Sequence, residues 1–206
     1  MNRSGNSGND DPQNQSDEGL QLAADGTGPL IQRDYWAVIN ACQLDPEEVI
    51  DIVRRRFRDL APRELVEFSN PGKSHLELGD EMEVHIRMGP DFGVRVADVS
   101  DLSITLTTLR GHAEAGKITF GCYRNTRGDV IFHIRSRARA KSLLHQIGFL
   151  TAADAMQTNT WTDFIDRLAH AVGDGVIGEI FADTCEVDDS EIDAKPDTPT
   201  FIAVSE

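Results

Sequence analysis

Three arginines alternate along one predicted strand, at Arg135, Arg137 and Arg139. Every second side chain of a β-strand points to the same face, so this spacing predicts a cationic row. A guanidinium can hold a carboxylate or a phosphate through two parallel hydrogen bonds. Arg33 and Arg124 could join the row if their strands are neighbours. The alternative is a salt-bridged outer face with partners such as Glu81 and Glu83, because cross-strand ion pairs of this kind are common.

A second candidate for chemistry is the pair His112 and Glu114, which lie together in a glycine-flanked turn. The imidazole could accept a proton while the carboxylate orients it. The alternative is a structural role in the turn, because no nucleophile lies nearby in the sequence. A metal site would need two further ligands, and His85 and His133 are expected on solvent-facing sides of their strands. The catalytic residues therefore stay unassigned, and neither a metal ion nor another cofactor is expected.

Three segments that alternate apolar with polar residues must position both candidates. They cover residues 102–107, 118–123 and 130–136, and their period of two predicts an antiparallel meander. The apolar face should be buried, and it consists of Leu102, Ile104, Leu106, Ile118, Phe120, Cys122, Val130, Phe132 and Ile134. The opposite face should be solvated, and it consists of Ser103, Thr105, Thr107, Thr119, His133, Arg135 and Arg137.

Helices and further strands flank this meander. Asp45-Pro46-Glu47-Glu48 predicts the start of a helix that must end by Ala61, because Pro62 follows. Strands are predicted at 33–40, 80–88 and from residue 92, which gives a sheet of six or seven strands. Short helical pieces at 141–149 and 151–156 precede a C-terminal helix from residue 159 or 160 to Gly173. That helix has an apolar stripe formed by Trp161, Phe164, Ile165, Leu168 and Val172. We expect Trp161 and Phe164 to pack on Phe120 and Phe132.

The negative charge of the chain is concentrated at its ends. The 206 residues have a formal net charge of −15; the first 25 carry five acids and one base, and the last 25 carry eight acids and one base. The interval between them is nearly balanced, so it lacks the concentrated positive charge of a nucleic-acid binder. We expect a disordered tail at 1–25, one domain at 26–181, and an acidic, disordered tail at 182–206.

The three cysteines, Cys42, Cys122 and Cys185, have neither zinc-site nor redox-pair spacing. We read them as reduced thiols of a cytoplasmic protein. No apolar run reaches 18 residues, so no membrane span is expected. The Gly-Thr-Gly at 26–28 lacks the preceding strand and following helix of a phosphate-binding loop.

Two further stretches carry a recognisable pattern. Residues 108–120 read TLRGHAEAGKITF, and residues 128–139 read GDVIFHIRSRAR. They are similar to a Leu-x-Gly-His-x-Glu-x-Gly turn that leads into a Phe-bearing strand, and to a Gly-Asp turn before an apolar-x-Ile-Arg-x-x-Ser/Ala-Arg strand. This pattern resembles a bacterial family of domains of unknown function, within the START-like, Bet v 1-like helix-grip (SRPBCC) superfamily. The Gly-x-Gly at 26–28 also resembles this family, and the order of elements agrees over residues 26–173.

This resemblance implies an α+β helix-grip fold, in which a curved antiparallel sheet wraps a long C-terminal helix. It also implies a small hydrophobic or amphipathic ligand in the cavity between sheet and helix. The candidate ligand-binding residues are Arg135, Arg137, Arg139, His112, Glu114, Phe120, Phe132 and Trp161. We expect an anionic end of the ligand to meet Arg137 and Arg139 at the cavity mouth.

Two alternatives to simple binding remain. One is a hydrolase- or cyclase-like enzyme that acts on a hydrophobic substrate in the same cavity. The other is a cavity filled by side chains, with a domain that works through its surface. The lack of a convincing nucleophile, metal set or cofactor loop favours binding, and the sequence leaves the oligomeric state open.

Overall fold

The computed structural model describes residues 19–69, 72–87, 89–141 and 143–191, with the backbone alone described at 143–154 and 191. The elements follow one another as η1 (Ala23–Asp25), β1 (Thr27–Ile39), α2 (Pro46–Leu60), β2 (Val66–Ser69), β3 (Glu81–Ile86), β4 (Asp91–Val99), β5 (Ser103–Thr108), β6 (Glu114–Arg124), β7 (Val130–Ala140), α3 (Leu143–Val172), β8 (Val176–Val187) and η2 (Asp189–Glu191), where η marks a 3-10 helix. None of the described helices is long and apolar enough to cross a bilayer.

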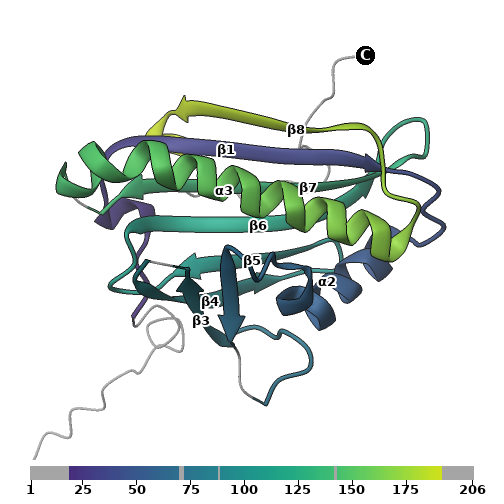
Figure 1. The fold of residues 1–206 in the computed structure, drawn as a ribbon, viewed down its shortest axis with the longest axis horizontal. Coiled ribbons are helices and arrows are strands. Elements are labelled where there is room, and N and C mark those ends of the chain that lie inside the picture. Colours follow the sequence, from purple (N-terminus) through teal and green to yellow (C-terminus); the bar gives the residue numbers. More distant parts are fainter. Residues whose placement is uncertain (1–18, 70–71, 88, 142, 192–206) are drawn as a thin grey trace, which may run out of the picture.

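The strands form one sheet in the order β2-β3-β4-β5-β6-β7-β1-β8. All neighbouring strands are antiparallel. Helix α3 lies across one face of this sheet along β1, β7 and β6 (Figure 1). Helix α2 lies near the C-terminal end of α3 (Figure 1). We call the face that carries the helices the inner face and the opposite one the outer face. The predicted meander corresponds to β5, β6 and β7, and the predicted early helix to α2.

The sheet has one or two strands more than expected, because the sequence did not predict β2 or β8. Strand β8 pairs with β1 from Val176 as far as Val187. The expected tail boundary at residue 182 is therefore wrong, because main-chain hydrogen bonds to β1 hold this acidic segment without an apolar face. At the other end, Leu20 forms a bridge with Leu109, so ordered structure begins before residue 26. The remaining tail predictions, at 1–18 and 192–206, lie outside the described residues.

Helix α3 is a single helix of 30 residues, whereas the sequence predicted two short pieces and a longer one. Its backbone continues through Gly148, near which the first piece was expected to end. A glycine inside a helix costs only about 1 kcal/mol relative to alanine, so packing of the long helix on the sheet outweighs it.

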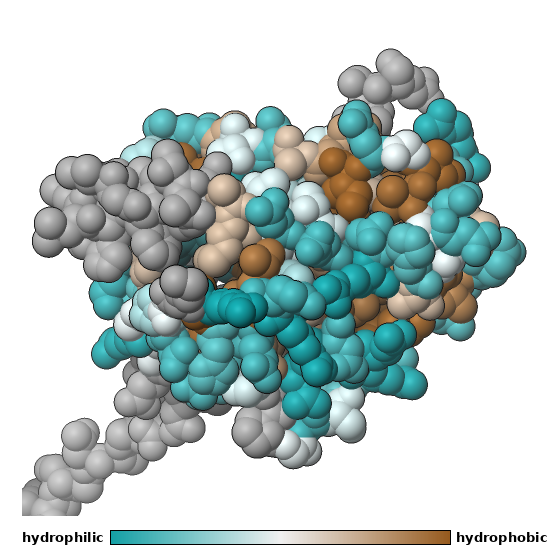
Figure 2. Space-filling view, viewed as in Figure 1, coloured by the Kyte–Doolittle hydropathy of each residue, from teal (hydrophilic) through white to brown (hydrophobic). Residues whose placement is uncertain are grey.

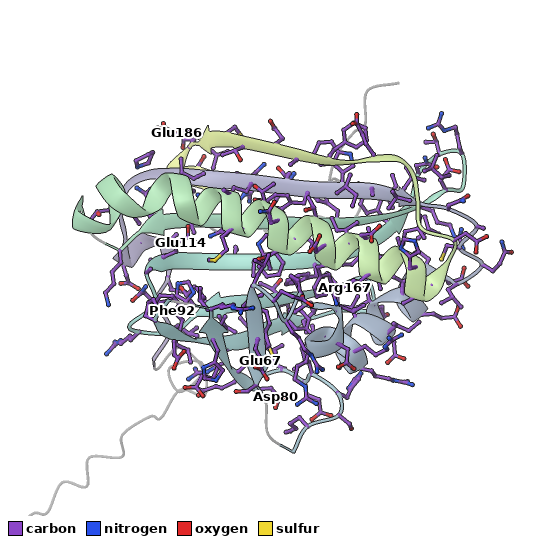
Figure 3. The ribbon with its side chains drawn as sticks, in the orientation of Figure 1. Glu67, Asp80, Phe92, Glu114, Arg167 and Glu186 are labelled. Carbon is purple, nitrogen blue, oxygen red and sulfur yellow. The ribbon has the colours of Figure 1, made fainter. Side chains whose placement is uncertain are left out.

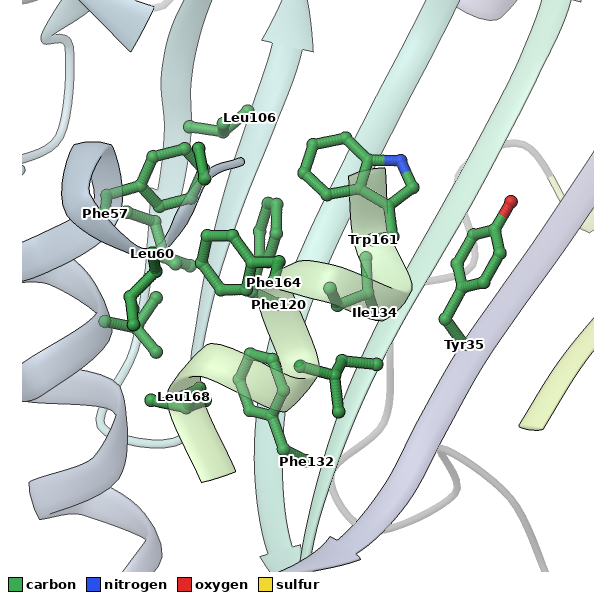
Figure 4. Close-up of a cluster of buried hydrophobic side chains, with 14 of the residues drawn as sticks. Tyr35, Phe57, Leu60, Leu106, Phe120, Phe132, Ile134, Trp161, Phe164 and Leu168 are labelled. Atoms are coloured by element: carbon green, nitrogen blue, oxygen red, sulfur yellow. The ribbon is translucent and has the colours of Figure 1, made fainter. Parts of the chain in front are cut away.

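Aromatic side chains join α3 to the sheet and to α2 (Figure 4). The ring of Phe164 lies 5.3 Å from Phe120 and 6.2 Å from Phe132, and Trp161 lies 5.4 Å from Phe120. Phe57 of α2 contacts the same group, 5.0 Å from Phe120. Full burial of such a side chain contributes about 1.5 to 3 kcal/mol, so this cluster fixes α3 on the inner face. The expected packing of Phe164 on both strand aromatics is confirmed.

Helix α2 contributes its apolar stripe to the core and most of its arginines to solvent. The main-chain N–H of Asp45 donates to the Glu48 carboxylate at 2.9 Å, as expected for a capped helix start. Arg55 pairs with Asp51 at 2.6 Å, with both side chains exposed. Arg54 is half-buried and donates to the main-chain oxygen of Leu76 at 2.9 Å, whereas the other arginines of the segment form a solvated helix face.

The outer face of the sheet is less solvated than its alternation predicted. His133 is fully buried, and four hydroxyl residues are almost fully buried, namely Ser103, Thr105, Thr107 and Thr119. The hydroxyls of Thr105 and Thr119 lie 2.9 Å apart and bond to each other. In the strand register Thr119 stands beside Arg135 and Thr107 beside Lys117, whose long aliphatic stems can cover short neighbours. The prediction of a wet face was wrong for these five residues.

On the inner side of the molecule, polar side chains separate the apolar areas of the surface. Figure 2 shows hydrophobic side chains in separate areas with hydrophilic side chains between them. The exposed large apolar side chains of β8 are Ile177 and Phe181.

Candidate functional site

A cavity of about 120 Å³ lies between the sheet and the middle of α3. Its wall takes main-chain or side-chain atoms from β2 to β7, from the β5–β6 turn and from α3. The lining residues are Val66, Phe68, Val84, Ile86, Phe92, Val94, Leu106, Thr108, His112, Ala113, Glu114, Gly116, Lys117, Ile118, Ser136, Ala138, Met156, Gln157, Thr160 and Trp161. Most of them are apolar, so the few polar groups among them decide what chemistry the cavity can accept.

Glu114 is the acidic side chain of the cavity wall. One carboxylate oxygen lies 3.4 Å from a guanidinium nitrogen of Arg33, and the other accepts a hydrogen bond from the Gln157 amide at 2.8 Å. The Arg33 side chain is 4% exposed and that of Glu114 20% exposed. Figure 3 shows Glu114 between β6 and α3. A buried cation and a carboxylate thus lie together at the wall, and the helix amide is a further partner of the carboxylate.

His112 stands beside Glu114 in the same turn. Nδ1 of His112 lies 3.0 Å from the main-chain N–H of Glu114, a donor, and 3.1 Å from the main-chain oxygen of the same residue, an acceptor. Either tautomer of the ring can therefore bond to the turn. Burial lowers the pKa of His112 to about 4, so the ring is neutral near pH 7. The ring packs on Phe92 at 4.5 Å. The cavity wall therefore includes a neutral imidazole.

Ser136 on β7 brings a hydroxyl to the cavity wall. Its residue is 6% exposed, and its Oγ makes no hydrogen bond to the described part of the chain. In the register, Ser136 lies between Ile118 of β6 and Arg33 of β1. A buried hydroxyl normally has a partner, so this one offers an unused hydrogen bond to whatever fills the cavity.

The segment before β1 holds the turn that carries His112 and Glu114. The side-chain amide of Gln21 donates to the main-chain oxygens of His112 at 2.9 Å and Glu114 at 2.7 Å. Its oxygen accepts from the N–H of Gly111 at 3.3 Å. Gln21 is itself buried, so these three bonds fix the turn against the N-terminal segment.

Two glycines of the recognised pattern allow close backbone approach at this corner. A Cβ on Gly116 would lie 2.2 Å from the main-chain oxygen of Arg137, and a Cβ on Gly26 would lie 2.6 Å from the Cβ of Arg139. Both distances are below any real contact, so a side chain at either position would push β7 away from its neighbours.

The arginine row lies on the outer face, away from the cavity. Arg135 donates to Asp34 at 2.6 Å, Arg137 donates to Gln32 at 2.8 Å, and Arg139 donates to the main-chain oxygen of Gly28 at 2.5 Å. Arg139 also pairs with Asp189. Ser136 and Ala138, which alternate with these arginines, line the cavity instead. The expectation that Arg137 and Arg139 meet a ligand at the cavity mouth is therefore wrong. The row matches the alternative of a salt-bridged outer face, and its main partners lie on β1.

The other two arginines do not join this row. Arg33 points to the inner face and pairs with Glu114. Arg124 bonds to the main-chain oxygens of Gly128 and Leu44 and to Asp45, at the opposite end of β7.

Of the remaining predicted ligand contacts, His112, Glu114 and Trp161 line the cavity. Phe120 and Phe132 belong to the aromatic cluster behind the cavity wall. Sequence reasoning missed Arg33 as a partner of Glu114, together with Ser136 and Gln157. A signal existed for Ser136, since it continues the alternation of Phe132 and Ile134 on the apolar face.

A group of side chains that could act as metal ligands lies outside the cavity. Candidate ligand atoms of Glu83, His85 and Asp91 lie within 4.8 Å of one another on β3 and β4. The hydrogen bond that His85 donates to Asp91 at 2.9 Å raises the pKa of His85, and the acids around it are exposed. None of the three lines the cavity, and exposed groups of this kind are common without an ion.

An antiparallel sheet that holds a long C-terminal helix on one face, with a cavity between them, defines a helix-grip fold. The fold is similar to that of a KanY protein, with a TM-score of 0.53, 10% sequence identity, and coverage of 71% of this chain and 99% of that one. The norcoclaurine synthase of Thalictrum flavum reaches a TM-score of 0.49 at 12% identity, covering 71% of this chain and 96% of its own. A hypothetical protein of Helicobacter pylori reaches 0.47 at 8% identity, covering 68% and 86%.

The chain belongs to the DUF1990 family, described as a domain of unknown function, whose model matches residues 59–167. No curated protein matches the sequence. At 10% identity, the likeness to the KanY protein bears on the fold alone.

Proposed function

We propose that this domain binds a small, mainly apolar ligand in the cavity between the sheet and α3. The observation that carries the proposal is a cavity of about 120 Å³ with an apolar wall and the unused hydroxyl of Ser136 in it. An apolar pocket with a few convergent polar groups is the usual form of a small-molecule site.

The cavity volume limits the ligand. An engineered apolar cavity of about 150 Å³ takes up benzene, so this one suits a group on the order of a single six-membered ring. Burial of its apolar surface would supply roughly 25 cal/mol per Å² removed from water. The polar wall groups would fix its orientation.

A hydrolase- or cyclase-like enzyme that uses the same cavity is the second candidate, because Glu114 and His112 stand together in its wall. A hydroxyl nucleophile needs a base within hydrogen-bond reach, and Ser136 Oγ has no such contact among the described residues. Nδ1 of His112 is occupied by the turn. These contacts support binding over hydrolysis.

Trp161 provides the test, because it lines the cavity and the only other tryptophan, Trp36, packs on Phe181 of β8. In a Trp36→Phe variant, the fluorescence of Trp161 is followed while toluene is added. We expect a saturable change. Ala138→Leu, which places a larger side chain in the cavity wall, should abolish the response, and Ala182→Leu on exposed β8 should retain it. If toluene gives no saturable response, or if both leucine variants respond alike, the proposal is wrong.

We also propose a cytoplasmic location. Its support is that Cys42, Cys122 and Cys185 are all free thiols.

A further inference from the structure

We infer that the cavity selects a neutral ring that carries a hydroxyl group, and that this hydroxyl donates to Glu114. The inference rests on the proposed binding function and names the class of ligand within it. It replaces the anionic ligand that the arginine row suggested from the sequence.

The ion pair at the cavity wall disfavours a charged ligand. Arg33 and Glu114 lie 3.4 Å apart in a largely buried setting. An incoming carboxylate would compete with Glu114 for Arg33 and would set two negative charges side by side with little water to screen them. An incoming ammonium would compete with Arg33 for Glu114 in the same way. A neutral ligand disturbs neither charge.

The hydrogen-bonding capacity of Glu114 favours a donor group. Its two oxygens together have room for about four hydrogen bonds, and two contacts, from Arg33 and Gln157, are seen. A hydroxyl can donate to a remaining lone pair without carrying charge. An ether oxygen cannot, because it has no proton to give.

Ser136 provides a second polar point in the same wall. Its hydroxyl has no partner among the described residues, and its residue is 6% exposed. In the register Glu114 faces Ala140, four residues along β7 from Ser136, which is about 13 Å between main-chain positions at 3.3 Å per residue. Side chains shorten this gap but do not close it, so a second oxygen on the far side of the ring suits Ser136.

The experiment compares probes that share one ring and differ in one group. Cyclohexanol, methoxycyclohexane, cyclohexanecarboxylate and cyclohexylammonium are titrated into the Trp36→Phe protein, with Trp161 fluorescence as the readout. These probes do not absorb where tryptophan is excited. We expect both charged probes to bind about tenfold more weakly than the alcohol or worse, because each disrupts the buried pair. The ether should bind several times more weakly than the alcohol.

Glu114→Gln provides a further test. The variant keeps the size of the side chain and removes the negative charge that an incoming carboxylate would face, so cyclohexanecarboxylate should bind more tightly to it than to the Trp36→Phe protein and the preference for cyclohexanol should shrink. The matched control is Glu81→Gln, which removes a carboxylate from an exposed pair with Arg95 at 2.7 Å. That control should leave the order of affinities unchanged.

Ser136→Ala is tested with 1,4-cyclohexanediol. The diol should bind more tightly than cyclohexanol to the Trp36→Phe protein, and Ser136→Ala should remove this advantage. Ser103→Ala removes the same atom from an equally buried serine on the outer face, and this variant should keep the tighter binding of the diol.

The outcomes separate this inference from the binding function. If the carboxylate, the ammonium or the ether binds as tightly as the alcohol, the inference that the cavity selects a neutral hydroxyl donor is wrong. The proposed binding function is not affected by that result. The comparison of probes on the Trp36→Phe protein decides this even if Glu114→Gln fails to fold. If neither toluene nor any ring probe binds, both the function and the inference are wrong.

Discussion

The carboxylate of Asp34 on β1 lies 2.6 Å from Nε2 of His133 on β7, and the imidazole is fully buried. A carboxylate can only accept, so Nε2 carries the proton. Burial raises the pKa of Asp34, but hydrogen bonds from His133 and Arg135 outweigh it and hold the pKa below its usual value. This pair is the centre of an outer-face network that includes Gln32, Arg135 and Arg137.

Replacement of Asp34 with alanine should destabilise the fold by about 3 to 5 kcal/mol, because it removes the carboxylate that a buried imidazole and a guanidinium share. Urea unfolding measures the change. Asp59→Ala is the matched control, because Asp59 also pairs with an arginine at 2.6 Å but is exposed. It should cost less than about 1 kcal/mol. Equal losses in the two variants would show that the Asp34 network adds nothing beyond a surface pair.

Stability should fall with acidification, in part through His112. Burial lowers its pKa from 6.5 to about 4, so below pH 6.5 the unfolded chain takes up a proton that the folded chain refuses. Its contribution is full above pH 6.5 and is lost as the pH falls toward 4. Asparagine at this position keeps an acceptor for the Glu114 N–H and cannot titrate. His112→Asn should therefore lose about 2 kcal/mol less stability than the unmodified protein between pH 7 and 4.5.

The control for this pH dependence is His170→Asn, whose ring is exposed at the end of α3. Its stability profile should match that of the unmodified protein. A His112→Asn profile that also matched would contradict the assigned cause.

Removal of the Phe164 ring should cost about 3 to 5 kcal/mol, because the side chain is fully buried among Phe57, Phe120, Phe132 and Trp161. Thermal and urea unfolding of Phe164→Ala measure the loss. Phe181→Ala removes an equal ring from exposed β8, where the residue is 43% exposed, and should cost much less. An unchanged thermal midpoint for Phe164→Ala would argue against α3 as part of the cooperative core.

Gln21→Ala should loosen the turn that carries His112 and Glu114. The change removes two donated bonds and one accepted bond from a buried position, for a loss of about 1 to 3 kcal/mol. Hydrogen exchange at the Gly111 amide should become faster, because its acceptor is gone. Gln43→Ala, at an exposed glutamine, is the control. If exchange at Gly111 does not change, Gln21 does not hold the turn.

The strongest sequence signals led to the correct elements. Strict alternation identified β5, β6 and β7, and an acid-Pro-Glu-Glu start identified α2. Strand β8 was not predicted from the sequence because its pairing with β1 depends on main-chain groups, whereas its side chains are mostly exposed and often acidic. Alternation cannot find a strand that lacks a buried face.

The site was predictable as a set of residues on one turn, but its partners were not. His112 and Glu114 were found together because they are close in sequence. Arg33 lies 81 positions from Glu114, and only the strand order that places β1 beside β7 brings them together. The arginine row was assigned to the cavity because sequence alternation shows which residues share a face, without showing which face α3 covers.

Strand β8 ends the described sheet, so its outer row of main-chain N–H and C=O groups is open to another chain. Such an edge is a template for aggregation, and the opposite edge limits the risk by being short, since β2 has only four residues. Strand β8 has 12 residues and carries Glu179, Asp183 and Glu186 along its length. Antiparallel pairing of two copies would place like charges across from each other, which is destabilising. The acidic composition that conceals this strand in the sequence is therefore also a barrier to edge-to-edge self-association.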